Sequence, residues 1–176
     1  MGAAETELTG ERADLAETLT AHRNFLRQTA RDLTDEQAAA RTTVSELCIG
    51  GLIKHVTAVE RNWVRFILGG PSAMMASNWQ DPAVQQAYAD GFRMMPGETL
   101  ASLLDDYEAA AAETAELLAT LPDLDARQPL PKAPWHPAGA TRSARRVLLH
   151  IIAETSQHAG HADIIREAID GAKTMG

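Results

Sequence analysis

The sequence predicts an all-α fold, a four-helix bundle with short additional helices. Three observations predict it. In four long segments the apolar residues recur every three or four positions, which is helical spacing. These segments are separated by glycines, prolines and capping residues. No run of useful length alternates between apolar and polar residues, as a half-buried strand would. Four long helices with short additions are typical of a bundle.

The first long helix is predicted over residues 8–33 and ends before Thr34. Its inward residues share one stripe, and they are Leu8, Leu15, Leu19, His22, Leu26 and Leu33. Gln37 stands three residues after Thr34, an arrangement that indicates a capping box. We therefore expect a short helix through Ala40.

Two further long helices follow from the same reasoning. Residues 49–67 carry an apolar stripe, and the helix stops at residues 69–71, which are Gly-Gly-Pro. A shorter helix is expected over residues 81–94, with Asp81 as N-cap and proline at the first helical position. Residues 100–121 then form the third long helix, closed by a proline.

The end of the chain supplies the fourth long helix. Residues 122–140 contain five prolines and no periodicity, so we expect a long irregular connection. The final helix covers residues 143–168 and is ended by Gly171. With 176 residues, the chain is predicted to be a single domain, residues 1–176.

Composition limits the classes of function. The formal net charge of −8 argues against a nucleic-acid partner, because phosphate neutralisation needs clustered lysines and arginines. No apolar run is long enough to predict a membrane helix. The polar, acidic amino terminus is unlike a secretory signal, and Cys48, the single cysteine, permits no internal disulfide. These features predict a cytoplasmic protein.

One basic cluster lies at the start of the last helix and consists of Arg142, Arg145 and Arg146. A solvated helix face is its simplest interpretation. An anion-binding site is the alternative.

The last helix carries polar residues on its predicted inward stripe, which is Leu148, Ile151, Glu154, His158, His161 and Ile165. Its two ends are aliphatic, and its centre is a carboxylate and two imidazoles. Burying an unpaired carboxylate costs several kcal/mol, on the order of the stability of a whole domain. The pattern therefore indicates a metal ion, a hydrogen-bonded network or a wet cavity.

A metal site is the sharper hypothesis. Glu154 and His158 are four residues apart, so both side chains leave the same face of the helix. His55, at the edge of the apolar face of residues 49–67, is the best third ligand. Two histidines and one carboxylate suit zinc, and nickel, iron or manganese accept the same ligands. A hydrogen-bonded Glu–His pair on a solvated face explains the spacing equally well.

Two segments resemble a known family. Residues 50–63 (GGLIKHVTAVERNW) are similar to the second helix of DinB-like (mini-DinB) proteins, and residues 150–161 (HIIAETSQHAGH) to their metal-binding last helix. The nearest subgroup is the actinobacterial branch related to mycothiol-dependent enzymes. Glu154 stands where that superfamily often has the first histidine of a His-x-x-x-His pair. His161 is a departure, because many relatives carry glutamine there.

The resemblance implies a bundle of the DinB/YfiT-like type that holds a divalent metal through His55, Glu154 and His158. It also implies a metal-dependent transferase or isomerase that uses a low-molecular-weight thiol, such as mycothiol, on small electrophiles. An anionic thiol would need local arginines such as Arg142 or Arg145. The alternatives are a non-catalytic metal-stabilised bundle with a stress-related or regulatory role, and a metal-free bundle with a buried polar network. A homodimer is compatible with this class.

The remaining histidines have open roles. His161 is either a core hydrogen-bonding residue, an outer ligand or a proton shuttle. His22 is either a buried imidazole or a group that reaches the cavity, and His150 is placed to orient Glu154. His136 is expected to be exposed. Cys48 is expected to be a buried residue at a helix start, and the tryptophans are the candidate aromatic walls of a pocket, namely Trp63, Trp79 and Trp135.

Overall fold

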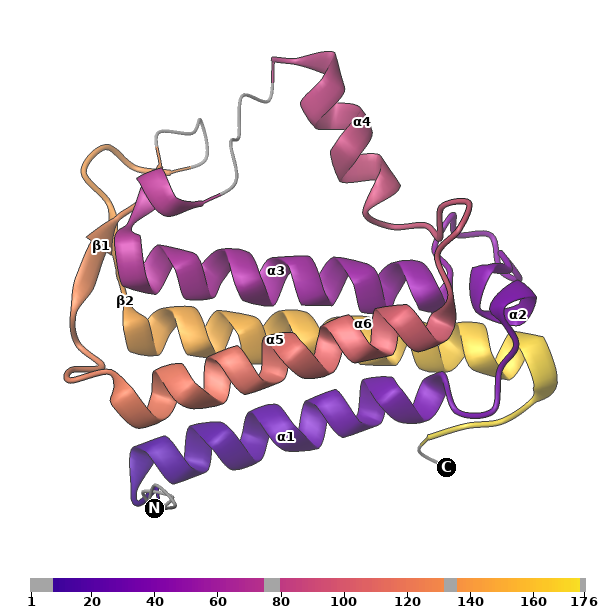
Figure 1. Ribbon diagram of the computed structural model, residues 1–176, viewed down its shortest axis with the longest axis horizontal. Helices are drawn as coiled ribbons and strands as arrows, with labels where there is room; N and C mark the ends of the chain where they lie inside the picture. The colour runs from indigo at the N-terminus through magenta and orange to yellow at the C-terminus, as the bar shows by residue number, and fades with distance from the viewer. Residues whose placement is uncertain (1–7, 75–79, 132–135, 175–176) are drawn as a thin grey trace.

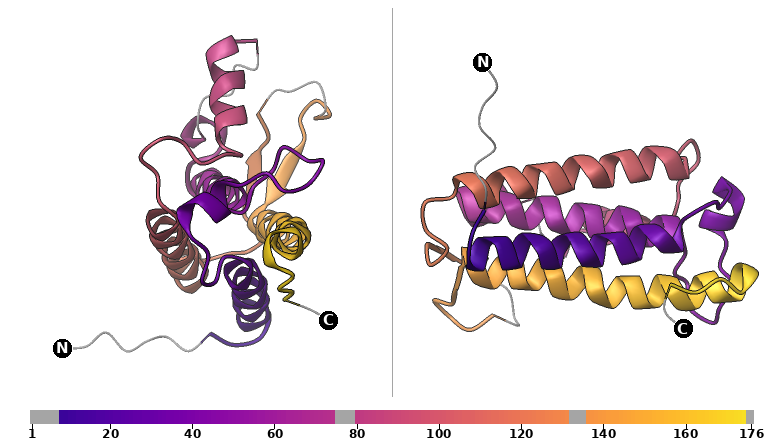
Figure 2. Two further views of the ribbon diagram at one scale, coloured as in Figure 1. Left: turned by 90° about the vertical axis from the view of Figure 1, so that its right-hand side faces the viewer. Right: turned by 90° about the horizontal axis from the view of Figure 1, so that it is seen from below.

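The computed structural model describes residues 8–74, 80–131 and 136–174, and within them the predicted all-α class is confirmed (Figure 1). The four long helices are α1 (Glu11–Thr29), α3 (Ile49–Gly69), α5 (Leu100–Thr120) and α6 (Ala144–Asp170). The short ones are α2 (Asp35–Ala39), the 3₁₀ turn η1 (Pro71–Ala73) and α4 (Pro82–Asp90). Seen end-on, the long helices form a four-cornered bundle in which α3 packs against α5 and α6, and α1 against α6 and α5 (Figure 2).

Local sequence signals place the helix ends close to the predicted ones. Thr34 and Gln37 form the predicted capping box of α2, and Asp81 caps α4, whose first residue is Pro82. Gly171 ends α6 in the left-handed conformation, with φ 78°, which glycine adopts without steric cost. Helix α4 is shorter than predicted, because the chain turns after Asp90.

The connection before α6 contains a feature that the sequence analysis missed. Strands β1 (Arg127–Pro129) and β2 (Thr141–Ser143) pair antiparallel, with Gln128 opposite Arg142. Three residues are too few to show an alternating pattern. This small sheet sets the start of α6, because Ser143 ends β2 and caps the helix by accepting a hydrogen bond from the backbone N–H of Arg146.

The apolar core has two parts along the bundle axis. One part includes Leu26, Leu52 and Ile165. The other includes Leu19, Phe66 and Leu148. Aliphatic side chains supply most of both parts, as the low aromatic content requires.

A polar layer from three helices lies within this core. Glu60 of α3 is fully buried, and its carboxylate pairs with the guanidinium of Arg23 on α1. The hydroxyl of Thr114 on α5 donates to the same carboxylate. Glu60 also raises the pKa of the buried phenol of Tyr107, although desolvation is the larger cause. A buried charge of this kind is tolerated because it is paired and hydrogen-bonded.

Arginines also close two helix ends. Arg12 of α1 donates to the carbonyls of Leu118 and Leu121 at the end of α5. Arg166 of α6 donates to the carbonyls of Thr29 and Arg31 at the end of α1. The last carbonyls of a helix have no intrahelical partner and carry the negative end of its dipole, so a cation stabilises them. These contacts fix α1 between α5 and α6.

Helix α4 stands out from the bundle above α3 (Figure 1) and has no buried residue. The backbone that follows it crosses α3 directly at Gly51. A Cβ atom built on Gly51 would lie 1.9 Å from the carbonyl oxygen of Phe92, so only glycine fits. This close approach places the side chain of Phe92 against α3, next to the predicted ligand His55.

Candidate metal centre

Three side chains named in the sequence analysis come together between α3 and α6. One donor atom from each of His55, Glu154 and His158 lies within 4.8 Å of the others. His158 Nε2 is 3.5 Å from Glu154 Oε2, and the rings of His55 and His158 are 4.9 Å apart at their centroids. Zinc bonds of about 2.0–2.2 Å to a tetrahedral ion place two ligand atoms roughly 3.4 Å apart. The group therefore fits a divalent metal ion.

The inward stripe of α6 agrees with the prediction at its aliphatic ends, where Leu148, Ile151 and Ile165 are buried. It differs in the centre, where the residues that face the core are Thr155, Ala159 and Ala162, all of them buried. Glu154 and His158 lie beside this stripe, with side chains 27 % and 12 % exposed. Small residues contribute little to an apolar pattern, so the true stripe gave a weak signal. As a result, the candidate centre is at the flank of the bundle and is open on one side.

Burial and charge keep the donor atoms in the form that a metal needs. The pKa of His55 is lowered to about 4, chiefly because burial disfavours the imidazolium and also because His158 is near; Glu154 acts in the opposite direction. The hydrogen bond with His158 lowers the pKa of Glu154. At neutral pH, His55 is thus neutral and Glu154 is ionised, as coordination requires.

Two more histidines of α6 lie next to these donors. The Nδ1 atoms of His161 and His158 are 3.4 Å apart, which leaves His158 Nε2 directed toward Glu154. His150 Nε2 lies 3.6 Å from the other oxygen of Glu154. His161 is therefore placed as a hydrogen-bonding partner of His158 and is half-buried rather than a core residue. Such partners fix the orientation of metal ligands.

Aromatic side chains border the group. Phe92 stacks on the His55 ring with centroids 4.0 Å apart, and Tyr88 of α4 meets the same ring edge-on at 6.3 Å. On the other side Trp63 contacts His150, with centroids 5.1 Å apart. Trp63 is thus the predicted aromatic wall that the structure places here, whereas Trp79 and Trp135 lie outside the described residues.

Neither Phe92 nor Tyr88 was predicted to lie at the site. The available signal was the Gly50-Gly51 pair, which indicates a close approach of another segment to α3. The buried pair of Arg23 and Glu60 was not predicted either. Glu60 falls four residues from both Val56 and Val64, on an apolar stripe, and this position is the signal of a buried carboxylate.

The other predicted residues lie apart from the metal group. His22 is half-buried against Phe25, with ring centroids 6.0 Å apart, and its neighbour Arg23 takes the core position. Cys48 is buried and caps α3, where its sulfur accepts from the backbone N–H of Gly51, as expected. His136 is half-buried rather than exposed, and its ring contacts the carbonyl of Pro131.

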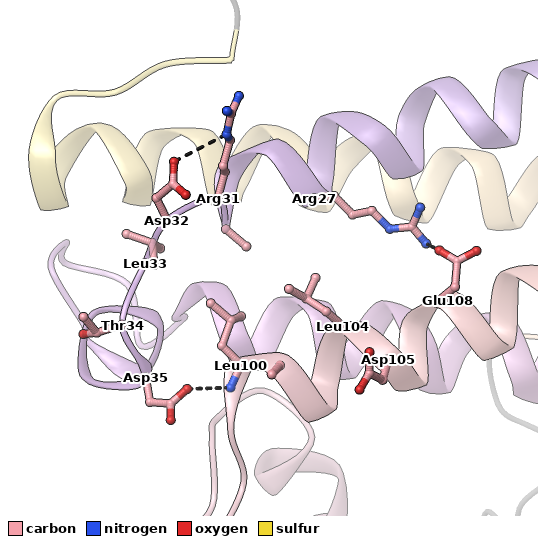
Figure 3. A pocket seen from close by; sticks show the side chains of 12 residues that line it. Arg27, Arg31, Asp32, Leu33, Thr34, Asp35, Leu100, Leu104, Asp105 and Glu108 are labelled. Atoms are coloured by element: carbon pink, nitrogen blue, oxygen red, sulfur yellow. Dashed lines mark hydrogen bonds and ion pairs between the residues drawn. The ribbon is translucent and has the colours of Figure 1, made fainter.

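A hollow of about 750 Å³ opens elsewhere, between the end of α1 and the start of α5 (Figure 3). Most of its charged side chains pair with one another or with the backbone. Arg27 pairs with Glu108, and the Asp35 carboxylate accepts from the backbone N–H of Leu100 at 2.7 Å. None of the metal-ligand candidates lines it. The candidate centre is therefore distinguished by its donor atoms and not by the size of a cavity.

No helix in the described part of the chain has the length and apolar character needed to span a membrane. The fold is similar to that in the crystal structure of a conserved protein from Enterococcus faecalis, with a TM-score of 0.61 and 17 % sequence identity. The match covers 94 % of this chain and 100 % of that one. A comparison with proteins of curated function gave no significant match.

The family comparison is more specific than the fold comparison. The sequence model of the family described as mycothiol-S-transferase matches residues 14–171. The match begins within α1, covers the other three long helices completely and includes the three candidate ligands. It confirms the predicted resemblance to DinB-like proteins of the mycothiol-dependent branch. The chain belongs to the mycothiol-S-transferase family.

Proposed function

We propose that this protein is a metal-dependent S-transferase that joins mycothiol, or a similar low-molecular-weight thiol, to small electrophiles. One observation supports it above the others: donor atoms of His55, Glu154 and His158, from two helices distant in sequence, lie within 4.8 Å of one another. The family match supplies the reaction class. Zinc is the proposed metal, because two imidazoles and one carboxylate suit it.

Each residue has a stated task in this proposal. His55, Glu154 and His158 hold the ion. When bound, a divalent cation lowers the pKa of a thiol and so supplies a thiolate at neutral pH. His161 and His150 fix the directions of His158 and Glu154 through their ring nitrogens. Phe92 and Tyr88 exclude water from one side of His55.

The transfer itself forms one sulfur–carbon bond and breaks the bond between that carbon and its leaving group, which departs with the electron pair. The thiol proton passes to solvent, which reaches the site on the exposed side of Glu154. A closed, purely structural metal site has four protein ligands, whereas three ligands leave a position for the thiol. The partly exposed triad supports the catalytic alternative for this reason.

The test combines metal analysis with an assay. Purified wild-type protein, His55→Ala and His158→Ala are measured for bound metal and for mycothiol transfer to 4-(bromomethyl)benzamide. His22→Ala is the matched control, because His22 is half-buried but outside the triad. We expect one zinc per chain and transfer in the wild type and the control, and neither in the triad variants. Metal without transfer favours a metal-stabilised bundle, and absence of metal contradicts the site.

A further inference from the structure

The three arginines at the start of α6 differ in their partners. Arg145 forms ion pairs with Glu11 and Asp125. Among the ion pairs of the described residues, none involves Arg142 or Arg146, although the chain has more carboxylates than basic groups. Arg145 therefore has a structural role, whereas the guanidinium groups of Arg142 and Arg146 retain donors for another molecule. The first of these is half-buried and the second is exposed.

A continuous series of contacts leads from Arg142 to the metal group. The Arg142 guanidinium lies over the Trp63 ring, 4.9 Å from its centroid. Trp63 meets the His150 ring edge-on at 5.1 Å, and His150 Nε2 is 3.6 Å from Glu154 Oε1. The stacking on Trp63 holds the guanidinium in one orientation and so reduces the entropy lost when it binds a ligand.

Arg146 lies on the face of α6 that also carries the metal group. Arg146, His150, Glu154 and His158 follow one another at intervals of four, so they occupy one face of the helix. Arg146 and Glu154 are about 12 Å apart along the helix axis, so an anion held at Arg146 is separated by several bonds from a group held near Glu154. The positive charges of Arg142 and Arg146 both act on His150, whose pKa they help to lower after the larger effect of burial.

We propose that Arg142 and Arg146 form an anion subsite that binds a carboxylate on the electrophile while the thiol is held at the metal group. This inference rests on the proposed function and adds a substrate class to it: electrophiles whose carboxylate lies several bonds from the reacting carbon. A carboxylate accepts two hydrogen bonds from one guanidinium, and charge assistance strengthens both. The carboxylate is not changed in the reaction; it positions the reacting carbon.

The experiment compares two rigid electrophiles that differ in one group, 4-(bromomethyl)benzoate and 4-(bromomethyl)benzamide, with mycothiol as the thiol. The proteins are the wild type, the double variant Arg142→Gln/Arg146→Gln, and Arg145→Gln as matched control. A thermal melt of each establishes that it is folded. Calorimetric binding of 4-methylbenzoate and 4-methylbenzamide, without thiol, provides a second measurement that does not depend on turnover.

We expect the wild type to prefer the benzoate by about tenfold in kcat/KM, the effect of one charge-assisted contact. Arg145→Gln keeps this preference and the double variant loses it, with the same order in calorimetry. Equal use of both electrophiles by the wild type overturns the inference and leaves the proposed function intact. A double variant that changes only the KM for mycothiol also overturns it, since the subsite then serves the thiol. If no thiol is transferred, the proposed function fails and calorimetry alone decides on the subsite.

Discussion

Glu60 is the one completely buried carboxylate among the described residues, and it lies among α1, α3 and α5. Its charge is tolerated only through Arg23 and Thr114. Both charges are out of water, so the loss of either partner leaves the other buried and unpaired. Removal of both partners together avoids that penalty.

We therefore expect Glu60→Met to lower the free energy of unfolding by about 3–5 kcal/mol. The double variant Arg23→Met/Glu60→Met is expected to recover most of this loss. Glu108→Gln removes a largely exposed partner of Arg27 and is the control, with an expected change below about 1 kcal/mol. Urea denaturation measures all three. A double variant at least as unstable as Glu60→Met would contradict a coupled pair.

His161 contacts the candidate centre through His158, with their Nδ1 atoms 3.4 Å apart. If its ring orients the ligand, His161→Phe weakens metal binding roughly 10–100-fold without removing a ligand. His136→Phe, a change in a half-buried histidine outside this group, leaves the affinity unchanged. Competition with a zinc chelator at pH 7.5 measures the affinities. Equal affinities for the wild type and His161→Phe would show that His158 needs no such support.

At the scale of helices, the contact between α3 and the segment after α4 decides where Phe92 lies. Gly51 has no room for a methyl group, since Phe92 O and Arg93 N approach it closely. Gly160, in the middle of α6, faces open space. An alanine substitution at these two glycines therefore changes the free energy of unfolding in opposite directions. Packing decides the change at Gly51, and backbone entropy decides it at Gly160.

Gly51→Ala is expected to destabilise the protein by about 1–3 kcal/mol, as overpacking does, and to move Phe92 away from His55. Gly160→Ala is expected to stabilise it by about 0.4–1 kcal/mol, because alanine restricts the unfolded chain. Thermal melts of the two variants check the signs. A neutral Gly51→Ala would mean that the segment after α4 shifts without cost.

Helices were easier to predict than the side of each helix that faces the core. Capping residues and prolines act locally, so the ends of α2 and α6 follow from the sequence. The convergence of His55, Glu154 and His158 also followed from helical spacing and the family resemblance. The centre of the inward stripe of α6 did not, because Ala159 and Ala162 are small and contribute little to an apolar pattern, whereas its aliphatic ends are buried as expected. The pairing of Arg23 with Glu60 was not predicted, because it joins two helices and helical spacing within one helix does not reveal a partner on another.

For the whole molecule, the buried imidazole of His55 links stability to pH. Its pKa is about 4 in the folded protein and ordinarily 6.5. Between these values the unfolded chain binds a proton that the folded protein does not. The free energy of unfolding therefore rises with pH through this window. The contribution of His55 to it is fully present above pH 6.5.

We expect the metal-free protein to lose on the order of 3 kcal/mol between pH 7 and pH 4 through His55 alone. His55→Asn lacks this part of the slope. Carboxylates with lowered pKa values, such as Asp125 and Asp170, titrate in both proteins, so their contribution cancels in the difference. Urea denaturation of both proteins at several pH values, with a chelator present, measures the difference in their free energies of unfolding. Parallel curves for the two proteins would contradict the buried, neutral His55.

The separation of two faces on α6 has an evolutionary consequence. Thr155, Ala159 and Ala162 pack in the core, while Glu154 and His158 occupy the neighbouring, partly exposed face. A substitution on the second face leaves the packed interior intact, so it incurs little of the stability loss that limits change in a core. Lineages that share this bundle are thus free to exchange ligands and acquire new chemistry while the scaffold remains the same.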